Sequence, residues 1–409
     1  LALSIAGKTI VNLNYSASQE DFNFFVKDTG INTLLTSKSF FEKQSLLFPR
    51  HLTILFIEDF FSKIDGKLLF SSGLIGLAAP MTFLQKICGN TKVDNVDDIL
   101  TILYTSGCTT PSQGVKLSHF NISSNIEGVA QVVPSATKKD KLLHTLPLFH
   151  SFGYMTMWLG LNHGIPLVMH SNPLDAIAIG KLVKEQKVTM LWTTPTFLNA
   201  YTTQVPPEMF GSLRFVLTGA EKLVTKHSEA FNERFGIRPV ESYGTTECSP
   251  IIATSTLDIR LPGIYQTGSL PGSVGQPLPG VMVRIVDPDS FEELPLGTEG
   301  LLLVKGPNVM QGYANRPDLT KLAMQGEWYI TNDIAVIDEN EFIIITDRIA
   351  RFSKINGEMI AHTKIEEVLH NVSNTPDHRF VVTTVPSEKG ESLAIVHTAP
   401  QSEIPQLIT

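Results

Sequence analysis

The run VTMLWTTPTFLNAYTTQVPPEMFGSLRFVLT, residues 188–218, decides the fold of this chain. Its residue pattern predicts a strand at 188–192, a helix at 195–203 and a second strand at 214–218. Strands that alternate with helices in this way are typical of a parallel sheet with helices packed on it. The alternation extends upstream, where the expected elements are helices near 121–132 and 174–186 and strands near 142–146 and 166–169.

Residues 1–100 follow the same alternation. Ser18 precedes an apolar helical pattern and Asp21 stands at the third helical position, which predicts a helix that starts at Ser18 with a variant of the capping box. The run 31–36 is apolar and is predicted to be a buried strand. This part of the chain is therefore expected to be α/β as well.

Residues 259–345 have a different pattern, in which glycines such as Gly263, Gly268 and Gly272 recur between short β-rich runs such as 281–286. This pattern predicts a small antiparallel barrel or sandwich. We therefore predict an α/β protein with a large domain, 1–346, made of layered α/β subdomains plus a β-barrel-like subdomain at 259–345. A small, truncated α+β domain is predicted for 347–409, with a helix near 363–370 and strands near 379–385 and 392–398.

Composition excludes several classes of protein. The chain of 409 residues is 43% hydrophobic, which allows a large core, and its net charge of −8 argues against a nucleic-acid partner. Cys88, Cys108 and Cys248 are too few and too far apart for a disulfide framework or a zinc site, so a reducing, cytoplasmic setting is expected. No signal peptide is recognisable, and the chain reads like a fragment that starts within a domain. The apolar run 74–84 is too short to span a bilayer.

The first candidate site is the loop 105–114, which follows the apolar run 99–104. Its hydroxyls and backbone amides can surround a polyphosphate, and Gly107 and Gly114 allow a close approach of the backbone. It is not a Walker loop, because no Gly-Lys-Ser/Thr follows at the right spacing. Taken alone, the loop is equally well explained as an ordinary surface turn.

A second polar turn, Tyr243-Gly244-Thr245-Thr246-Glu247, lies more than a hundred residues later. An aromatic ring can cover an adenine, a threonine can bind an α-phosphate, and the Glu247 carboxylate can hold Mg²⁺. Asp333 and Arg348 add an acid that suits a ribose and a cation. Taken alone, the turn is also compatible with a capped strand-to-helix connection.

Together, these motifs resemble the adenylate-forming superfamily of acyl-CoA and acyl-carrier-protein synthetases, nonribosomal peptide adenylation domains and firefly luciferase. They stand in the family's order over nearly the whole chain: 102–107, 146–150, 219–223, 243–247, 306–313, 328–333 and 347–358. Residues 12–16 and 354–360 resemble one branch in particular, the acyl-carrier-protein synthetase half of the bifunctional 2-acylglycerophosphoethanolamine acyltransferase.

The resemblance implies a reaction in two steps that uses ATP and Mg²⁺. A fatty-acid carboxylate attacks the α-phosphate of ATP, which gives an acyl-adenylate and pyrophosphate, and a thiol then takes the acyl group. The implied partners are a long-chain fatty acid, acyl carrier protein or CoA and, through a segment before residue 1, a lysophospholipid at the inner face of a bacterial membrane.

The resemblance also implies roles for individual residues. Thr105, Ser106, Gly107, Cys108 and Thr109 would surround the β- and γ-phosphates. The other implied contacts are Gly219, Ala220 and Glu221 for adenine and the acyl channel, Tyr243, Gly244 and Thr245 around the nucleotide, Thr246 for the α-phosphate, Glu247 for Mg²⁺, Asp333 for the ribose, Arg348 for ribose or phosphate, and His150 as a gate.

Several residues depart from the family pattern. Cys108, Thr110 and Gln113 replace a hydroxyl residue, a glycine and a lysine of the phosphate loop, and the loss of the lysine is expected to slow adenylation. Asn332 replaces a glycine before the ribose aspartate, and Ala350 replaces the usual Asp or Lys of the hinge. The catalytic lysine loop of the family has no counterpart in the chain.

Three alternatives remain open. The stretch 170–175 matches the His-x4-Asp pattern of glycerolipid acyltransferases, which we interpret as a chance match. Aromatic and methionine side chains at 149–158 are compatible with an acyl tunnel and equally with plain core. The whole chain is also compatible with a CoA ligase or another carboxylate adenylator, and with a degenerate nucleotide- or acyl-binding module that has no activity.

Overall fold

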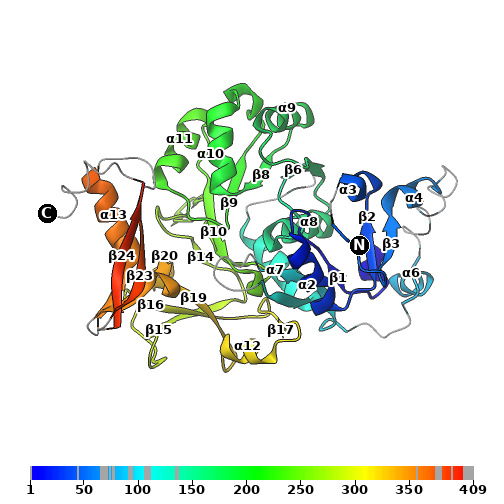
Figure 1. Cartoon of the computed structure of the whole chain (residues 1–409). Helices are drawn as coiled ribbons and strands as arrows, with labels where there is room; N and C mark the ends of the chain where they lie inside the picture. Colours follow the sequence, from blue (N-terminus) through cyan, green and yellow to red (C-terminus); the bar gives the residue numbers. More distant parts are fainter. Residues whose placement is uncertain are drawn as a thin grey trace. The chain divides into compact units, whose positions relative to one another are not determined.

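The computed structural model (Figure 1) describes the chain except for residues 1, 44–45, 65–71, 73–74, 76–78, 91–94, 106–111, 134–136, 138, 356–357, 374–379, 388–389 and 399–409. The contacts divide the chain into two compact units. Unit 1 comprises Leu1–Val281 and Lys305–Gln325, and unit 2 comprises Met282–Val304 and Gly326–Thr409. Among the described residues, no helix is long and apolar enough to cross a bilayer.

A seven-stranded sheet forms the centre of unit 1, with the strand order β14-β11-β10-β9-β8-β6-β7. Its strands are β6 (Leu142–His144), β7 (Leu167–Met169), β8 (Met190–Thr193), β9 (Phe215–Thr218), β10 (Val240–Gly244), β11 (Ile251–Thr254) and β14 (Gln276–Pro277). All pairs from β10 to β7 are parallel, whereas β11 pairs antiparallel with β10 and β14. The parallel sheet predicted from the strand–helix alternation is therefore confirmed.

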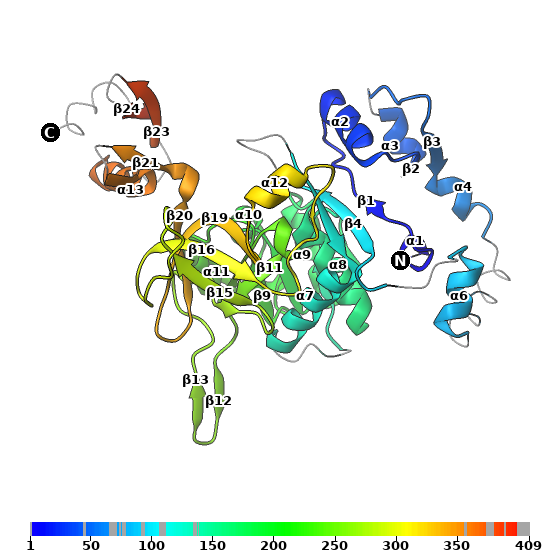
Figure 2. The ribbon, with the colours of Figure 1, turned by 90° about the horizontal axis from the view of Figure 1, so that it is seen from below.

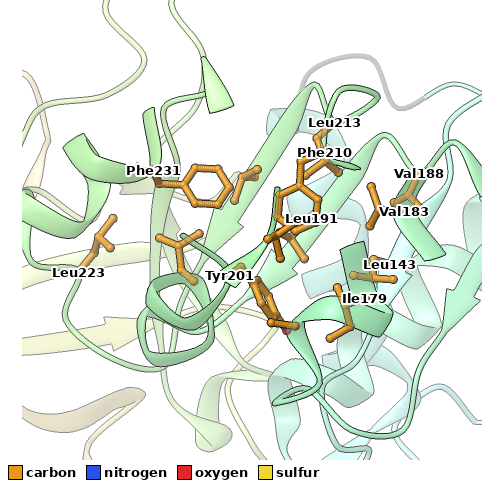
Figure 3. Packing of buried hydrophobic residues seen from close by; sticks show 14 residues of the cluster. Leu143, Ile179, Val183, Val188, Leu191, Tyr201, Phe210, Leu213, Leu223 and Phe231 are labelled. Atoms are coloured by element: carbon orange, nitrogen blue, oxygen red, sulfur yellow. The ribbon is translucent and has the colours of Figure 1, made fainter. Parts of the chain in front are cut away.

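Helices cover both faces of this sheet. They are α7 (His119–Val132), α8 (Ser151–His163), α9 (Ala176–Gln186), α10 (Pro195–Gln204) and α11 (Thr225–Phe235). Figure 3 shows side chains from α9, α10 and α11 packed against strand residues such as Leu143 and Leu191, all of them buried. Since neighbouring residues of a strand point to opposite faces, Trp192 points away from this cluster and its ring stacks on Phe152 of α8 at 6.0 Å.

Local sequence explains where two of these helices begin. The Asp175 carboxylate accepts a hydrogen bond from the backbone N–H of Ala178 and so caps α9. Thr194 caps α10, and Pro195 occupies its first turn, where no N–H is needed. Asp175 thus has a structural role, in agreement with the interpretation of 170–175 as a chance match to the acyltransferase pattern.

A second sheet of unit 1, of order β1-β4-β5-β17, joins segments that are far apart in the sequence. It contains β1 (Ile10–Val11), β4 (Ile99–Tyr104), β5 (Gly114–Ser118) and β17 (Gly312–Tyr313). The remaining elements of unit 1 are α1 (Ala2–Ile5), α2 (Gln19–Thr29), β2 (Thr33–Thr36), α3 (Lys38–Lys43), β3 (Thr53–Phe56), α4 (Ile57–Phe61), α6 (Met81–Ile87), the short helices Pro207–Met209 and Thr246–Cys248, β12 (Ile259–Leu261), β13 (Ile264–Gln266), α12 (Pro317–Leu322) and β18 (Met324–Gln325).

Two expectations for the N-terminal part have different outcomes. The hydroxyl of Ser18 accepts a hydrogen bond from the backbone N–H of Asp21 at 3.1 Å, so the predicted helix start is confirmed. The strand predicted at 31–36 exists as β2, but its prediction as a buried strand is wrong, because half-buried and exposed residues alternate along it. Among the described residues, β2 pairs only with β3. Alternate side chains of a strand point to opposite faces, and one face of this two-stranded sheet is open to solvent.

Unit 2 is rich in antiparallel strands. Its elements are β15 (Met282–Val286), β16 (Gly300–Lys305), β19 (Trp328–Ile337), β20 (Ile343–Arg348), the short helix Ile349–Arg351, β21 (Phe352–Ile355), β22 (Glu358–Ala361), α13 (His362–Ser373), β23 (Phe380–Ser387) and β24 (Gly390–His397). β19 pairs antiparallel with β16 and β20, β21 with β22, and β23 with β24. The helix and two strands expected after residue 347 are present.

The two compact units divide the chain at other points than the predicted boundary at residue 346. Residues 282–304 and 326–337 lie in the same unit as β20 because their strands pair with one another. By contrast, β12, β13 and β14 of the predicted β-rich stretch belong to unit 1. A large domain at 1–346 and a lid at 347–409 therefore stay a prediction.

Candidate functional site

The carboxyl ends of three parallel strands of unit 1, β6, β9 and β10, carry most of the predicted site. His150 lies in the segment after β6, Gly219 directly follows β9 and Thr245 directly follows β10. From β6 the chain moves outward to β7 on one side, while β8, β9 and β10 continue on the other side. The strand order therefore reverses between β6 and β8, and open α/β sheets bind their ligands outside the carboxyl ends of the strands at such a reversal.

The turn after β10 passes so close to the segment at Pro250 that only glycine fits at position 244. A Cβ placed on Gly244 would lie 1.9 Å from the carbonyl oxygen of Pro250, so no other residue fits there without a shift of the chain. The backbone N–H of Thr245 donates to the same carbonyl oxygen at 3.0 Å. The turn is therefore fixed by its own backbone before any ligand binds.

Glu247 is a buried carboxylate at the end of this turn, with 8% of its surface exposed. Its Oε1 accepts a hydrogen bond from the hydroxyl of Tyr313 at 2.8 Å, and its backbone carbonyl accepts from the N–H of Met310 at 2.7 Å. A buried carboxylate requires such partners, because an unpaired charge away from water is costly.

Tyr313 also connects Glu247 to the first candidate loop. Tyr313 is opposite Val115 in the β17–β5 pair, and the N–H of Ala314 donates to the carbonyl of Gly114 at 2.7 Å. Since β5 directly follows the loop 105–113, the two polar turns that the sequence singled out lie on neighbouring elements of unit 1.

The first loop is described only at its two ends. The backbone N–H of Thr105 donates to the carbonyl of Gln113 at 3.0 Å, and the hydroxyl of Thr105 accepts from the N–H of Gln113 at 3.0 Å. These two bonds close the loop where β4 ends and β5 begins. The predicted phosphate contacts Ser106, Gly107, Cys108 and Thr109 lie outside the described residues.

His150 and Thr246 are joined through one intervening residue. His150 is the last residue before α8, and the hydroxyl of the following Ser151 lies 3.3 Å from that of Thr246. The protein atoms around the imidazole desolvate it and lower the pKa of His150, which favours the neutral ring at neutral pH. The ring of Phe149 lies 4.5 Å from that of His150 and 5.2 Å from that of Tyr15.

The loop after β9 holds Gly219, Ala220 and Glu221. The N–H of Gly219 donates to the carbonyl of Thr193 at 3.2 Å, and a Cβ on Gly219 would lie 2.6 Å from the hydroxyl of Ser242. Ala220 has a φ of 70°, in the left-handed region. The carboxylate of Glu221 accepts hydrogen bonds from the hydroxyl and the N–H of Thr196, at 2.6 and 3.1 Å, and so ties this loop to the start of α10.

Asp333 and Arg348 lie in unit 2, where they face each other in the β19–β20 pair. Nε of Arg348 donates to Oδ1 of Asp333 at 3.1 Å; the aspartate side chain is 4% exposed and that of the arginine 75%. Asn332, the residue before the aspartate, has a φ of 61°. Asparagine adopts this left-handed conformation more readily than most residues other than glycine, which accounts for its presence where the family has glycine.

Sequence reasoning missed three residues of the site in unit 1. Tyr313 binds Glu247, Ser151 contacts Thr246 and Thr196 binds Glu221. Tyr313 and Ser151 stand in or directly after motifs that carried the resemblance, and Thr196 follows the proline that starts α10. Tyr313 and Ser151 could have been found from their place in or next to the predicted motifs, whereas Thr196 adjoins no motif and carried no such signal.

Glu247 suits Mg²⁺ only in combination with a phosphorylated substrate. Among the described residues no group of three or more His, Cys, Asp or Glu side chains could hold a metal ion by itself. Protein sites for Mg²⁺ commonly supply one or two carboxylates, and substrate phosphates and water complete the octahedron. One buried carboxylate next to a loop that can hold phosphates has this donor chemistry.

The strand order, the loops at the carboxyl edge and the buried carboxylate define a class, that of α/β proteins which bind a phosphorylated ligand at a topological switch point. The comparison with known families makes the class specific. Residues 1–314 match the family described as AMP-binding enzyme, and the chain belongs to this family.

Curated relatives match over most of this chain but over less of their own length. 4-Coumarate--CoA ligase-like 6 of Arabidopsis thaliana is 28% identical to this chain. The match covers 98% of this chain and 70% of the plant protein. A long-chain-fatty-acid--CoA ligase of Salmonella typhimurium is 31% identical to this chain. The match covers 67% of this chain and 48% of the Salmonella protein.

Solved structures agree with the fold. ATP-bound MatB from Rhodopseudomonas palustris is 25% identical to this chain and superposes with a TM-score of 0.78. The superposition covers 99% of this chain and 78% of the MatB chain. The O-succinylbenzoate coenzyme A synthetase MenE of Bacillus subtilis, in complex with ATP and magnesium ion, is 22% identical with a TM-score of 0.75 and covers 98% of this chain and 77% of its own. The predicted fold class, a large α/β part followed by a smaller C-terminal part, is confirmed.

Proposed function

We propose that this chain is the carboxylate-activating part of a ligase that joins a long-chain fatty acid to a thiol through an acyl-adenylate. The observation that carries this proposal is the bond of Tyr313 to Glu247, which connects the two polar turns of an AMP-binding family member. The similarity to the long-chain-fatty-acid--CoA ligase of Salmonella typhimurium supports a long-chain fatty acid as the acid.

In the first step, a carboxylate oxygen of the fatty acid attacks the α-phosphorus of ATP. The bond to the β-phosphate breaks, and pyrophosphate leaves. Such a transfer needs stabilisation of charge on the phosphate oxygens and correct positioning, with little covalent participation by the protein. Mg²⁺, when bound, neutralises charge on the phosphates.

Residues of unit 1 would position these groups. The hydroxyl of Thr246 would bind the α-phosphate, while Glu247, fixed by Tyr313, would hold Mg²⁺. The amides of the loop that begins at Thr105 would receive the β- and γ-phosphates. The other nucleotide contacts we propose are Ser106, Gly107, Cys108, Thr109, Gly219, Ala220, Glu221, Tyr243, Gly244 and Thr245 in unit 1 and Asp333 and Arg348 in unit 2.

In the second step, a thiol attacks the acyl carbon and AMP leaves. His150, an exposed residue at the start of α8, has a lowered pKa that favours the neutral imidazole, and we propose it as a gate between nucleotide and acyl group. We propose acyl carrier protein as the thiol, with CoA as the alternative that the names of the curated relatives favour. The acyl product would serve the reacylation of a lysophospholipid such as 2-acylglycerophosphoethanolamine.

The test is exchange of radiolabelled pyrophosphate into ATP with a panel of fatty acids of different length. We expect exchange that depends on the fatty acid and on Mg²⁺, slower than in family members with a lysine in the place of Gln113. The variant Glu247→Gln should reduce exchange about a hundred-fold or more, because Mg²⁺ loses its charged ligand. The control Glu229→Gln changes an exposed glutamate of α11 and should leave exchange unchanged.

The outcomes separate the candidate functions. Fatty-acid-dependent exchange followed by formation of acylated carrier protein supports the full proposal, and acyl-CoA as the only thioester supports the alternative thiol. Binding of ATP and fatty acid without any exchange would overturn the ligase and favour a binding module, which the replacement of the loop lysine by Gln113 already motivates. Unchanged exchange in Glu247→Gln would overturn the role of that carboxylate.

A further inference from the structure

The hairpin β12–β13 projects from the rest of unit 1 (Figure 2). Every residue of its two strands is exposed. A two-stranded hairpin on its own is marginally stable in water, and apolar side chains gain nothing from such exposure. The large apolar residues of this hairpin are Ile259, Leu261, Ile264 and Tyr265, exposed by 47%, 59%, 58% and 61%.

The register of the hairpin arranges its side chains in layers. Pro262 and Gly263 form the turn, and the next pair is Leu261 opposite Ile264. Arg260 opposite Tyr265 comes after that pair. The tip 261–264 therefore carries no charge, and a belt with one cation and one aromatic hydroxyl lies directly behind it.

The polar groups behind the tip are matched to one another. The guanidinium of Arg260 lies 5.1 Å from the centre of the Tyr265 ring, and its side chain is 77% exposed. The carboxylate of Asp258 accepts hydrogen bonds from the hydroxyl of Tyr265 at 3.1 Å and from the N–H of Gly268 at 3.0 Å. The same carboxylate lies 3.9 Å from the guanidinium of Arg260, an exposed ion pair of the kind that contributes little stability, and the Arg260 side chain stays largely exposed.

From this arrangement we propose that the hairpin tip inserts into the surface of a lipid bilayer that contains anionic phospholipid. Two residue layers along a strand span about 7 Å at ~3.3 Å per residue. This length fits the depth of roughly 5–10 Å to which interfacial protein segments enter a membrane. Aromatic hydroxyls and arginines favour the headgroup level, where Arg260 meets the phosphate charge that it complements.

This inference goes beyond the proposed function and does not require it. A hairpin in the interface would attach unit 1 to the phase in which a long-chain fatty acid dissolves. An attachment of this kind is peripheral, because the tip reaches no deeper than the membrane interface. A second copy of the chain and a protein partner are the competing occupants of the same surface.

Vesicle co-sedimentation without ATP or fatty acid tests the proposal separately from any activity. The whole chain should sediment with vesicles of phosphatidylethanolamine and phosphatidylglycerol. The double variant Leu261→Asp with Ile264→Asp should lose binding about ten-fold or more, since two apolar side chains no longer leave water. The control Leu174→Asp changes a leucine that is 63% exposed outside the hairpin and should bind like the unmodified chain.

Two further variants make the test specific. Arg260→Gln should weaken binding to the anionic vesicles more than binding to pure phosphatidylcholine vesicles, because only the former offer net charge. Tyr265→Trp should show a blue shift of its fluorescence on addition of vesicles and quenching by brominated lipid. Thermal unfolding of each variant checks that the fold is intact, which the exposure of all these side chains leads us to expect.

The proposal is overturned if the unmodified chain stays in the supernatant, or if the double variant sediments as well as the control. It is equally overturned if light scattering shows a dimer that the double variant dissociates while vesicle binding is unchanged. In that case the hairpin is a surface for self-association. Absence of fatty-acid activation together with normal vesicle binding would reject the ligase function and leave this inference intact.

Discussion

Tyr313 and Glu247 stand 66 positions apart, and the hydrogen bond between their side chains links the two polar turns of unit 1. The bond orients a carboxylate that is almost fully buried, and it leaves the second carboxylate oxygen for another partner. At the scale of single residues, the site therefore depends on a tyrosine whose role no motif at residues 243–247 discloses.

We predict that Tyr313→Phe raises the KM for Mg·ATP and lowers the free energy of unfolding by about 1–3 kcal/mol, because a buried carboxylate loses its hydrogen-bond donor. Pyrophosphate exchange at varied ATP and urea unfolding measure the two effects. The matched control is Tyr265→Phe, which removes a hydroxyl from the exposed hairpin. An unchanged KM in Tyr313→Phe would show that the tyrosine does not position Glu247 for catalysis.

At the scale of elements, the start of α8 is set by a close contact that involves Gly153. A Cβ on this residue would lie 2.3 Å from the carbonyl oxygen of Pro147 and 2.8 Å from that of Leu146. The same backbone is held by His144, whose Nε2 lies 3.1 Å from the carbonyl of Gly153. The helix thus packs directly on the loop that leads from β6 to His150.

Gly153→Ala should consequently destabilise the protein by about 2 kcal/mol or more, since backbone atoms on both sides must move. The shift would displace Ser151 from Thr246, so exchange activity should fall even in the folded fraction. Gly211→Ala serves as the control, because the nearest atom to its Cβ is 3.7 Å away. Equal urea midpoints for the two variants would contradict the packing argument.

At the scale of the whole molecule, a half-buried carboxylate, Glu241, and a buried one, Asp140, give the stability opposite dependences on pH. Burial raises the pKa of Glu241 on β10 to about 7, although the N–H of Leu223 and the charge of Lys222 oppose the rise. The pKa of Asp140 is lowered, mainly by its bond to Arg214. The contribution of Asp140 is present at neutral pH and is lost as pH falls through its acidic range.

The sign for Glu241 is the reverse. The pKa of Glu241 in the folded chain lies above its value in the unfolded chain. Its contribution to the free energy of unfolding is therefore complete below about pH 4.5 and is lost as pH rises through about 7. In the unmodified chain, the free energy of unfolding should fall by a contribution on the order of 3 kcal/mol as pH rises between these two values. We predict that this fall is absent in Glu241→Gln, because glutamine does not ionise. Urea unfolding at several pH values measures this; parallel curves for Glu241→Gln and the unmodified chain would contradict it.

The sequence by itself determined the parallel sheet, its helices and the position of both polar turns. Apolar runs such as 188–192 and 214–218, separated by one helix, leave few other arrangements, and caps such as Ser18 act within a single turn of chain. The residues that carried the family resemblance were also visible in sequence, because the motif order is a property of the chain alone.

Only the tertiary structure decided which side chains meet. The pairing of β17 with β5, which brings Tyr313 to Glu247, joins segments almost two hundred residues apart, and no local pattern encodes such a contact. The exposure of β2 and of the β12–β13 hairpin was equally hidden, because an apolar run predicts a strand but not what covers it. Burial depends on contacts with residues that are distant in sequence, and only the folded chain determines whether such contacts form.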